Sequence, residues 1–219
     1  MIFNLDGGHA LVGAVGARGN GYKEEVEARK VVSSLKNKLE RLGHTVNIVS
    51  CDNESDKNRQ LSKITEKSNS LKSDIFISIH LNSFHSAAAH GVEVYYYPGS
   101  EKGYNYAKKV CEHVCSLGYS NRGAKAEKFY VLKNTNVPAI LVECGFILNK
   151  NDMNRFNPDK IADKIIYAIT GETVYNKEET KDIFYRVVAG SYKDKNNALK
   201  IEKELKEKGY NAFLVATEV

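Results

Sequence analysis

Three polar segments of this sequence each follow an apolar run and carry side chains suited to metal binding or acid–base chemistry. His9 comes shortly after the first apolar run, His80 closes a second, and Glu143 closes a third. In an open parallel sheet the carboxyl ends of the strands meet at one edge, where functional groups collect. Each histidine alone is also typical of a hydrogen-bonded structural residue, but all three together favour a metal site or an acid–base site at that edge.

Glu24 is a fourth candidate, because helical periodicity groups it with apolar side chains. It precedes Leu35 by eleven residues, about three helical turns, so both side chains share the face that turns to the core. A buried, unpaired carboxylate is costly, and coordination to a cation would account for it. The alternative is stabilisation of the helix N-terminus, which favours acids in the first turn. Glu25 and Glu27 are expected to point elsewhere, into solvent.

The glycine-rich segment 7–21 approaches two nucleotide-binding patterns and completes neither. A Rossmann pattern would need a third glycine where Glu24 stands, and a Walker pattern would need a lysine where Ala14 stands. Both patterns fail at a residue that they require. The sequence therefore favours a loop that carries His9 over a phosphate-binding loop.

The elements that would position these residues alternate between strand and helix. Apolar runs predict strands over residues 2–5, 45–49, 74–80, 91–97, 129–133 and 139–143. Helical spacing predicts helices over residues 24–42, 55–69, 104–115 and 152–169. This alternation is typical of an α/β fold, a mostly parallel twisted sheet with helices on both faces, which we expect to span residues 1–170.

The remainder of the chain predicts a linker and a small C-terminal segment. Residues 171–182 are polar and without periodicity, which is typical of a linker. Residues 183–219 predict a strand–helix–strand segment, with strands over 184–188 and 212–215 and a helix over 196–208. Such a segment is too short to bury a core and leaves strand edges unpaired. We therefore expect two tails to associate into a homodimer; the alternatives are packing on the chain's own larger domain or completion by a missing second half.

The composition excludes a disordered chain, a collagen-like chain and a disulfide-dense mini-protein. The chain has 219 residues, of which 42% are hydrophobic and 27% charged, which is ordinary for a folded globular protein. A net charge of +5, without a basic stripe interleaved with aromatics, gives no expectation of nucleic-acid binding. No apolar run is long enough for a membrane span, and the first residues do not resemble a secretory signal. We therefore expect synthesis in the cytoplasm without a leader.

Seven motifs, in order, resemble the zinc-dependent N-acetylmuramoyl-L-alanine amidases of the amidase-3 family. They include an Asp-x-Gly-His start, a Ser-Ile-His-x-Asn strand end and a Val-Glu-x-Gly-Phe terminus. The motifs occupy residues 6–9, 21–24, 78–82, 91–96, 122–125, 129–139 and 142–146. One departure is Ala10, which stands where the family often has glycine and bears on the loop rather than on the ligands.

The resemblance implies a hydrolytic zinc site and a substrate. Its zinc ligands would be His9, Glu24 and His80, and Glu143 would be the catalytic carboxylate. The bond cleaved would join N-acetylmuramic acid to L-alanine in peptidoglycan. The alternatives are a catalytically inactive peptidoglycan-binding module of the same fold and a zinc hydrolase of another amide.

Two further asparagines and the tail complete what the resemblances imply. Asn82 and Asn134 would bind substrate or support the site. The tail resembles the first half of a SPOR domain, a βαββαβ unit that binds peptidoglycan glycan. The protein is thus expected to act on the cell wall after release, as a phage endolysin or as an autolysin that lyses its own mother cell.

Overall fold

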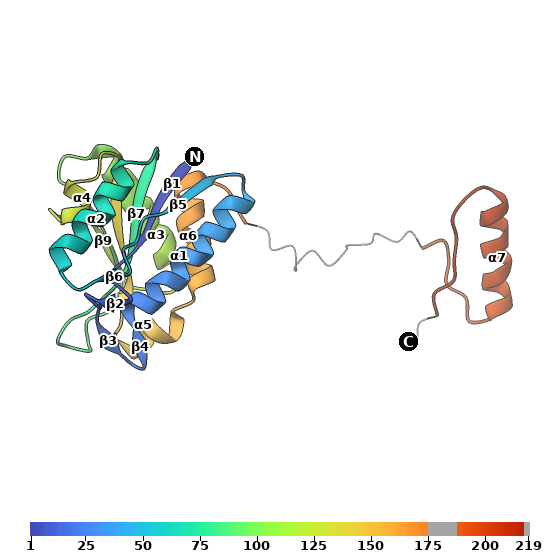
Figure 1. Ribbon diagram of the computed structural model, residues 1–219. Helices are drawn as coiled ribbons and strands as arrows, with labels where there is room; N and C mark the ends of the chain where they lie inside the picture. Colours follow the sequence, from blue (N-terminus) through green and yellow to red (C-terminus); the bar gives the residue numbers. More distant parts are fainter. Residues whose placement is uncertain (175–187, 217–219) are drawn as a thin grey trace. The chain divides into compact units, whose positions relative to one another are not determined.

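The computed structural model describes residues 1–174 and 188–216 of the chain. It divides into two compact units, Met1–Val174 and Tyr175–Val219 (Figure 1). In the described part of the chain, no helix is both long enough and apolar enough to span a bilayer.

A six-stranded sheet forms the centre of the larger unit. In spatial order its strands are β5 (Thr45–Ile48), β1 (Ile2–Gly7), β7 (Ile75–Asn82), β10 (Ala139–Phe146), β8 (Val92–Tyr96) and β9 (Asn121–Ala126). The β10–β8 pair is antiparallel, and the other neighbours are parallel. The predicted α/β class, with a mostly parallel sheet, is therefore confirmed.

Helices cover both faces of this sheet (Figure 1). The helices on one face are α1 (Glu24–Arg41), α3 (Glu101–Cys115) and α6 (Pro158–Thr170). On the other face lie α2 (Lys57–Asn69) and the short α4 (Tyr130–Lys133). Strand alternation divides the side chains between the two cores, since Ile77 packs on the first side and Phe76 on the second.

The second face of the sheet carries two of the candidate site residues. The helices α2 and α4 pack there with Phe76 and Ala139, which lie near the starts of β7 and β10. His80 and Glu143 lie further along the same two strands, at even spacing from these residues, and so share this face. At the carboxyl ends of β7 and β10, polar side chains therefore project from the second face, next to the apolar core that α2 and α4 cover.

Several short strands and one short helix lie in the loops of the larger unit. They are β2 (Val12–Gly13), β3 (Arg18–Gly19), β4 (Tyr22–Lys23), β6 (Asn53–Glu54) and α5 (Lys150–Arg155). β2 pairs with β6, which ties the glycine-rich loop to the segment after β5. β3 and β4 pair with each other just before α1 begins.

In the larger unit, two of the predicted elements differ from the structure, and one strand of the central sheet was not predicted. The predicted strand over residues 129–133 is wrong, because this segment forms the helix α4. The predicted helix over residues 152–169 is two helices, since Pro158 begins α6 and Asn157 caps it by accepting a hydrogen bond from the Lys160 amide. The edge strand β9 was not predicted, because its sequence Asn-Arg-Gly-Ala-Lys-Ala has no apolar run.

The start of α1 is more deeply buried than its sequence indicates. Glu25 and Glu27 are only 2% and 5% exposed, so the prediction that they point into solvent is wrong. Arg18, from the glycine-rich loop, forms two hydrogen bonds of 2.6 Å to the Glu25 carboxylate. Lys30 pairs with Glu27 at 2.9 Å. The loop therefore supplies the partner of Glu25, and α1 itself supplies the partner of Glu27.

In the described part of the smaller unit, α7 (Lys195–Glu207) is the single regular element. It agrees with the predicted helix and is capped by Asp194, which accepts a hydrogen bond from the Asn196 amide. The predicted strand over residues 212–215 is wrong, since this segment forms no strand. The predicted strand over 184–188, apart from Val188, and the predicted linker from residue 175 onward lie outside the described residues.

Candidate functional site

Three side chains predicted from the sequence lie together at the carboxyl edge of the sheet. The His80 Nδ1 atom is 2.9 Å from Glu24 Oε1, and the His9 Nε2 atom is 3.2 Å from the same oxygen. One ligand atom from each residue lies within 4.8 Å of the others, so the set could hold one metal ion. Strand β1 leads to His9, strand β7 carries His80, and Glu24 is the first residue of α1.

Strand register places Glu143 beside this cluster. Glu143 on β10 lies opposite His80 on β7 and, on its other side, opposite Glu93 on β8. Side chains at paired positions of neighbouring strands project from the same face of a sheet. The register therefore forms a row in which Glu143 stands between an imidazole and a second carboxylate.

Glycines allow the loop to approach these side chains closely. A Cβ atom at Gly8 would come within 2.1 Å of the His80 ring, and one at Gly16 within 2.7 Å of both Glu24 and His9. Any larger residue would displace a member of the cluster. The glycine-rich loop is thus built for contact with His9, Glu24 and His80, in keeping with the preference for a loop that carries His9.

Arg29, which the sequence analysis did not single out, fixes the backbone that carries His9. Its guanidinium donates to the carbonyl oxygens of Gly7, of Gly8 at 3.0 Å and of His9 at 2.7 Å. Asp52 accepts from Arg29 Nε at 3.0 Å and holds the guanidinium in place. His9 has a φ of 62°, which is uncommon for a residue other than glycine, so the loop needs such support.

Glu24 is a buried anion between two imidazoles. Glu24 is only 4% exposed, and burial by itself would raise the pKa of its carboxyl group. Hydrogen bonds with His80 and His9 outweigh burial and hold the pKa of Glu24 well below its usual range. The other oxygen, Oε2, accepts a hydrogen bond from the Ala17 amide at 2.9 Å. An ionised carboxylate in this setting suits a cation.

Glu143 has the opposite electrostatic character. Its Oε2 atom is buried and has no hydrogen-bond partner among the described residues. Burial raises the pKa of Glu143 well above its usual range, and the carboxylates of Glu24 and Glu93 raise it further. Two carboxylates of contrasting proton affinity on neighbouring elements are typical of acid–base sites.

The two predicted asparagines lie at different edges of the sheet. Asn82 lies two residues beyond His80 on β7 and donates a hydrogen bond to Glu93, beside the cluster. Asn134 follows α4, and its carbonyl oxygen accepts from Asn69 Nδ2 at 2.7 Å. Since Asn69 ends α2 shortly before β7 begins, Asn134 lies at the amino edge of the sheet, away from the cluster.

Family models match most of the chain. The model described as N-acetylmuramoyl-L-alanine amidase matches residues 4–172. The model of the SPOR domain matches residues 159–216, so its match begins within α6 rather than at residue 183.

Individual relatives agree with the first of these matches. The N-acetylmuramoyl-L-alanine amidase CwlM of Bacillus licheniformis is 27% identical over 96% of this chain and 83% of its own length. The sporulation-specific N-acetylmuramoyl-L-alanine amidase of Bacillus subtilis is 27% identical over 91% and 79%. The solved catalytic domain of the CD27L endolysin, which targets Clostridia Difficile, has a TM-score of 0.73 and 27% identity over 80% of this chain and 99% of that domain. The chain therefore belongs to the amidase-3 family of N-acetylmuramoyl-L-alanine amidases.

Proposed function

We propose that this protein is a zinc hydrolase that cleaves the amide bond between N-acetylmuramic acid and L-alanine in bacterial peptidoglycan. The observation that carries the proposal is the convergence of His9, Glu24 and His80 at one sheet edge, with Glu143 beside them. Family membership supports the substrate and the bond.

The residues present fit a zinc ion. Two imidazoles and one carboxylate are a common ligand set of hydrolytic zinc sites, which keep a further position open. The ionised Glu24, held between His9 and His80, supplies the carboxylate of this ligand set. Bound there, zinc would polarise the scissile carbonyl and lower the pKa of a water molecule.

Residues of the chain itself would hold the site in place and transfer the proton. Arg29 keeps the loop that carries His9 in place through its backbone hydrogen bonds. Glu143 would accept the proton of the attacking water and return it to the leaving amine nitrogen. Its Oε2 atom has no competing partner among the described residues, which leaves it available to carry that proton. Asn82 would support the neighbouring Glu93.

Product analysis on purified peptidoglycan tests this proposal. We expect new amino-terminal alanine to appear, to stop when a chelator is added, and to return when zinc is restored. Reducing sugar ends, measured in parallel, should not increase, because no glycosidic bond is cut. Binding to the wall without release of alanine would contradict the proposal and favour the inactive binding module of the same fold.

We also propose that the two units divide catalysis and wall attachment. Residues 1–170 would be the catalytic domain, residues 171–182 a linker, and residues 183–219 a wall-binding segment. The SPOR match supports peptidoglycan as the ligand of the C-terminal part. The protein would accordingly act at the cell wall, in host wall turnover or in phage lysis.

Self-association of the tail is a prediction that light scattering can check. None of the α7 side chains is buried, and apolar residues of the tail such as Leu199 and Phe213 are 43% and 65% exposed. We expect the full chain to have twice the monomer mass at high micromolar concentration, because a second tail would cover these side chains. A chain ending at Val174 should be monomeric. Monomers in both samples would show that no dimer forms through the tail.

A further inference from the structure

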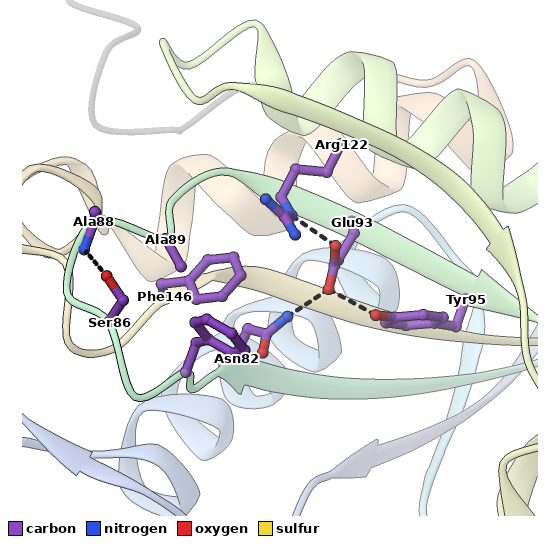
Figure 2. A pocket seen from close by; sticks show the side chains of 9 residues that line it. Asn82, Ser86, Ala88, Ala89, Glu93, Tyr95, Arg122 and Phe146 are labelled. Carbon is purple, nitrogen blue, oxygen red and sulfur yellow. Dashed lines mark hydrogen bonds and ion pairs between the residues drawn. The ribbon is translucent and has the colours of Figure 1, made fainter.

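A groove of about 460 Å³ lies beside the candidate site on the same face of the sheet. Figure 2 shows the side chains that line it. Its floor includes Glu93 of β8 and Asn82 of β7, and Arg122 of β9 and Phe146 of β10 also line it. Glu93 is the residue paired with Glu143, so the groove lies directly beside Glu143. A volume of this size is within the range of small-molecule binding pockets.

The charged cluster around Glu93, a lining residue of the groove, has more cations than anions. Glu93 is only 3% exposed, and its carboxylate accepts hydrogen bonds from Arg122 Nε at 2.7 Å, from Tyr95 at 2.6 Å and from Lys125 Nζ. Burial would raise the pKa of Glu93, but the hydrogen bonds from Lys125, Tyr95 and Arg122 prevail and hold it at about 2. One ionised carboxylate therefore faces two cations, which leaves one positive charge without a counterpart in this cluster.

Arg122 is oriented for a further ligand. Its guanidinium carbon lies over the Phe146 ring, 5.0 Å from the ring centroid. Its Nε atom donates a hydrogen bond to Glu93, which Figure 2 shows. Nη1 is 3.5 Å from the His90 carbonyl oxygen, and Nη2 makes no hydrogen bond to any described residue. A guanidinium fixed on one edge and stacked on an aromatic ring is preorganised to bind a carboxylate with its other edge.

We propose that this groove binds the peptide on the leaving side of the scissile amide, and that Arg122 binds a carboxylate of that peptide while Lys125 offsets the negative charge of Glu93. This inference rests on the proposed function. In peptidoglycan the alanine is followed by a glutamate joined through its side chain, so the second residue keeps an α-carboxyl that is free in some walls and amidated in others.

The spacing of the strands fits a carboxylate on the second residue of the peptide. Arg122 is on β9, two strands away from Glu143 on β10, and neighbouring strands lie about 4.8 Å apart, so the two are separated by about 10 Å. An extended peptide advances about 3.3 Å per residue. A group projecting from the second residue, together with the reach of the Arg122 side chain, spans this separation.

Binding of the released peptide tests the groove separately from catalysis. The probes are two synthetic tripeptides, L-alanyl-γ-D-glutamyl-L-lysine with a free α-carboxyl on glutamate and the same peptide with a carboxamide there. Their dissociation constants would be measured by NMR titration of the full chain and of the Arg122→Gln, Lys125→Gln and Lys128→Gln variants. Lys128 is exposed, and it is neither among the residues that line the groove nor among those that bond to Glu93, so it is the control for loss of one positive charge.

We expect the native chain to bind the carboxylate form at least about 10-fold more tightly than the amide, as a charge-assisted hydrogen bond allows. Arg122→Gln should abolish this preference, Lys125→Gln should reduce it, and Lys128→Gln should keep it. Equal affinity for the two peptides, no binding of either, or a folded Arg122→Gln protein that keeps the preference would overturn the inference. Because no bond is cut in this assay, its result is independent of alanine release from peptidoglycan.

Discussion

A protein with glutamine in place of Glu143 is expected to release alanine from peptidoglycan about 100- to 10,000-fold more slowly than the native chain, the usual contribution of a general acid–base group. The substitution keeps the size of the side chain but removes the oxygen that would carry the proton. Zinc content should stay unchanged, because Glu143 is not among the three clustered ligand residues. Rates of amino-terminal alanine release and metal analysis of the same samples check both expectations.

A matched substitution separates this effect from a general loss of charge. Glu127 is an exposed carboxylate near the end of β9, and Glu127→Gln should retain nearly native turnover. Circular dichroism of both variants establishes that they fold alike. Near-native activity in the Glu143→Gln protein would remove this residue from the proposed mechanism.

The second large effect is expected from His80→Ala, which should abolish stoichiometric zinc binding. Loss of a residue that merely supports a ligand costs 10- to 100-fold in metal affinity, so loss of a ligand should lower the affinity by more than about 100-fold. Activity should fall with zinc content. In the native chain, by contrast, activity lost to a chelator should return when zinc is added.

His85 offers a control for this experiment, because it is an exposed histidine in the loop that follows β7. His85→Ala should keep both its zinc and its activity. Metal analysis after dialysis against a weak chelator measures the zinc bound to each variant. Undiminished zinc in the His80→Ala protein would contradict the assignment of His80 as a ligand.

The sequence by itself determined the class of fold and the position of the cluster along it. Apolar runs alternating with helical periodicity predicted the sheet, and polar residues at the strand ends marked its functional edge. Periodicity also placed Glu24 on the inward face of α1, where the structure has it buried. The elements behind these predictions could be recognised because each carries its own periodic repeat, and their alternation along the chain then indicated the fold class.

Short or polar segments carry too little periodicity for their secondary structure to be predicted from the sequence. The run over residues 129–133 is apolar in part and only five residues long, a length at which strand and helix cannot be told apart. It forms the helix α4. The strand β9 is a polar edge strand, and its pairing with β8 is set by the sheet rather than by any apolar pattern of its own.

Only the tertiary structure decided which distant side chains meet around the site. The bonds from Arg29 to the loop of His9, and from Arg122 to Glu93, join residues that are 20 and 29 positions apart. Asn134, although its motif matched, lies at the other edge of the sheet, beside Asn69. A periodic pattern reports the face on which a residue lies within its own element. It carries no information about which other element packs there, because that contact depends on how the strands are ordered in the sheet and how the loops fold over its edge.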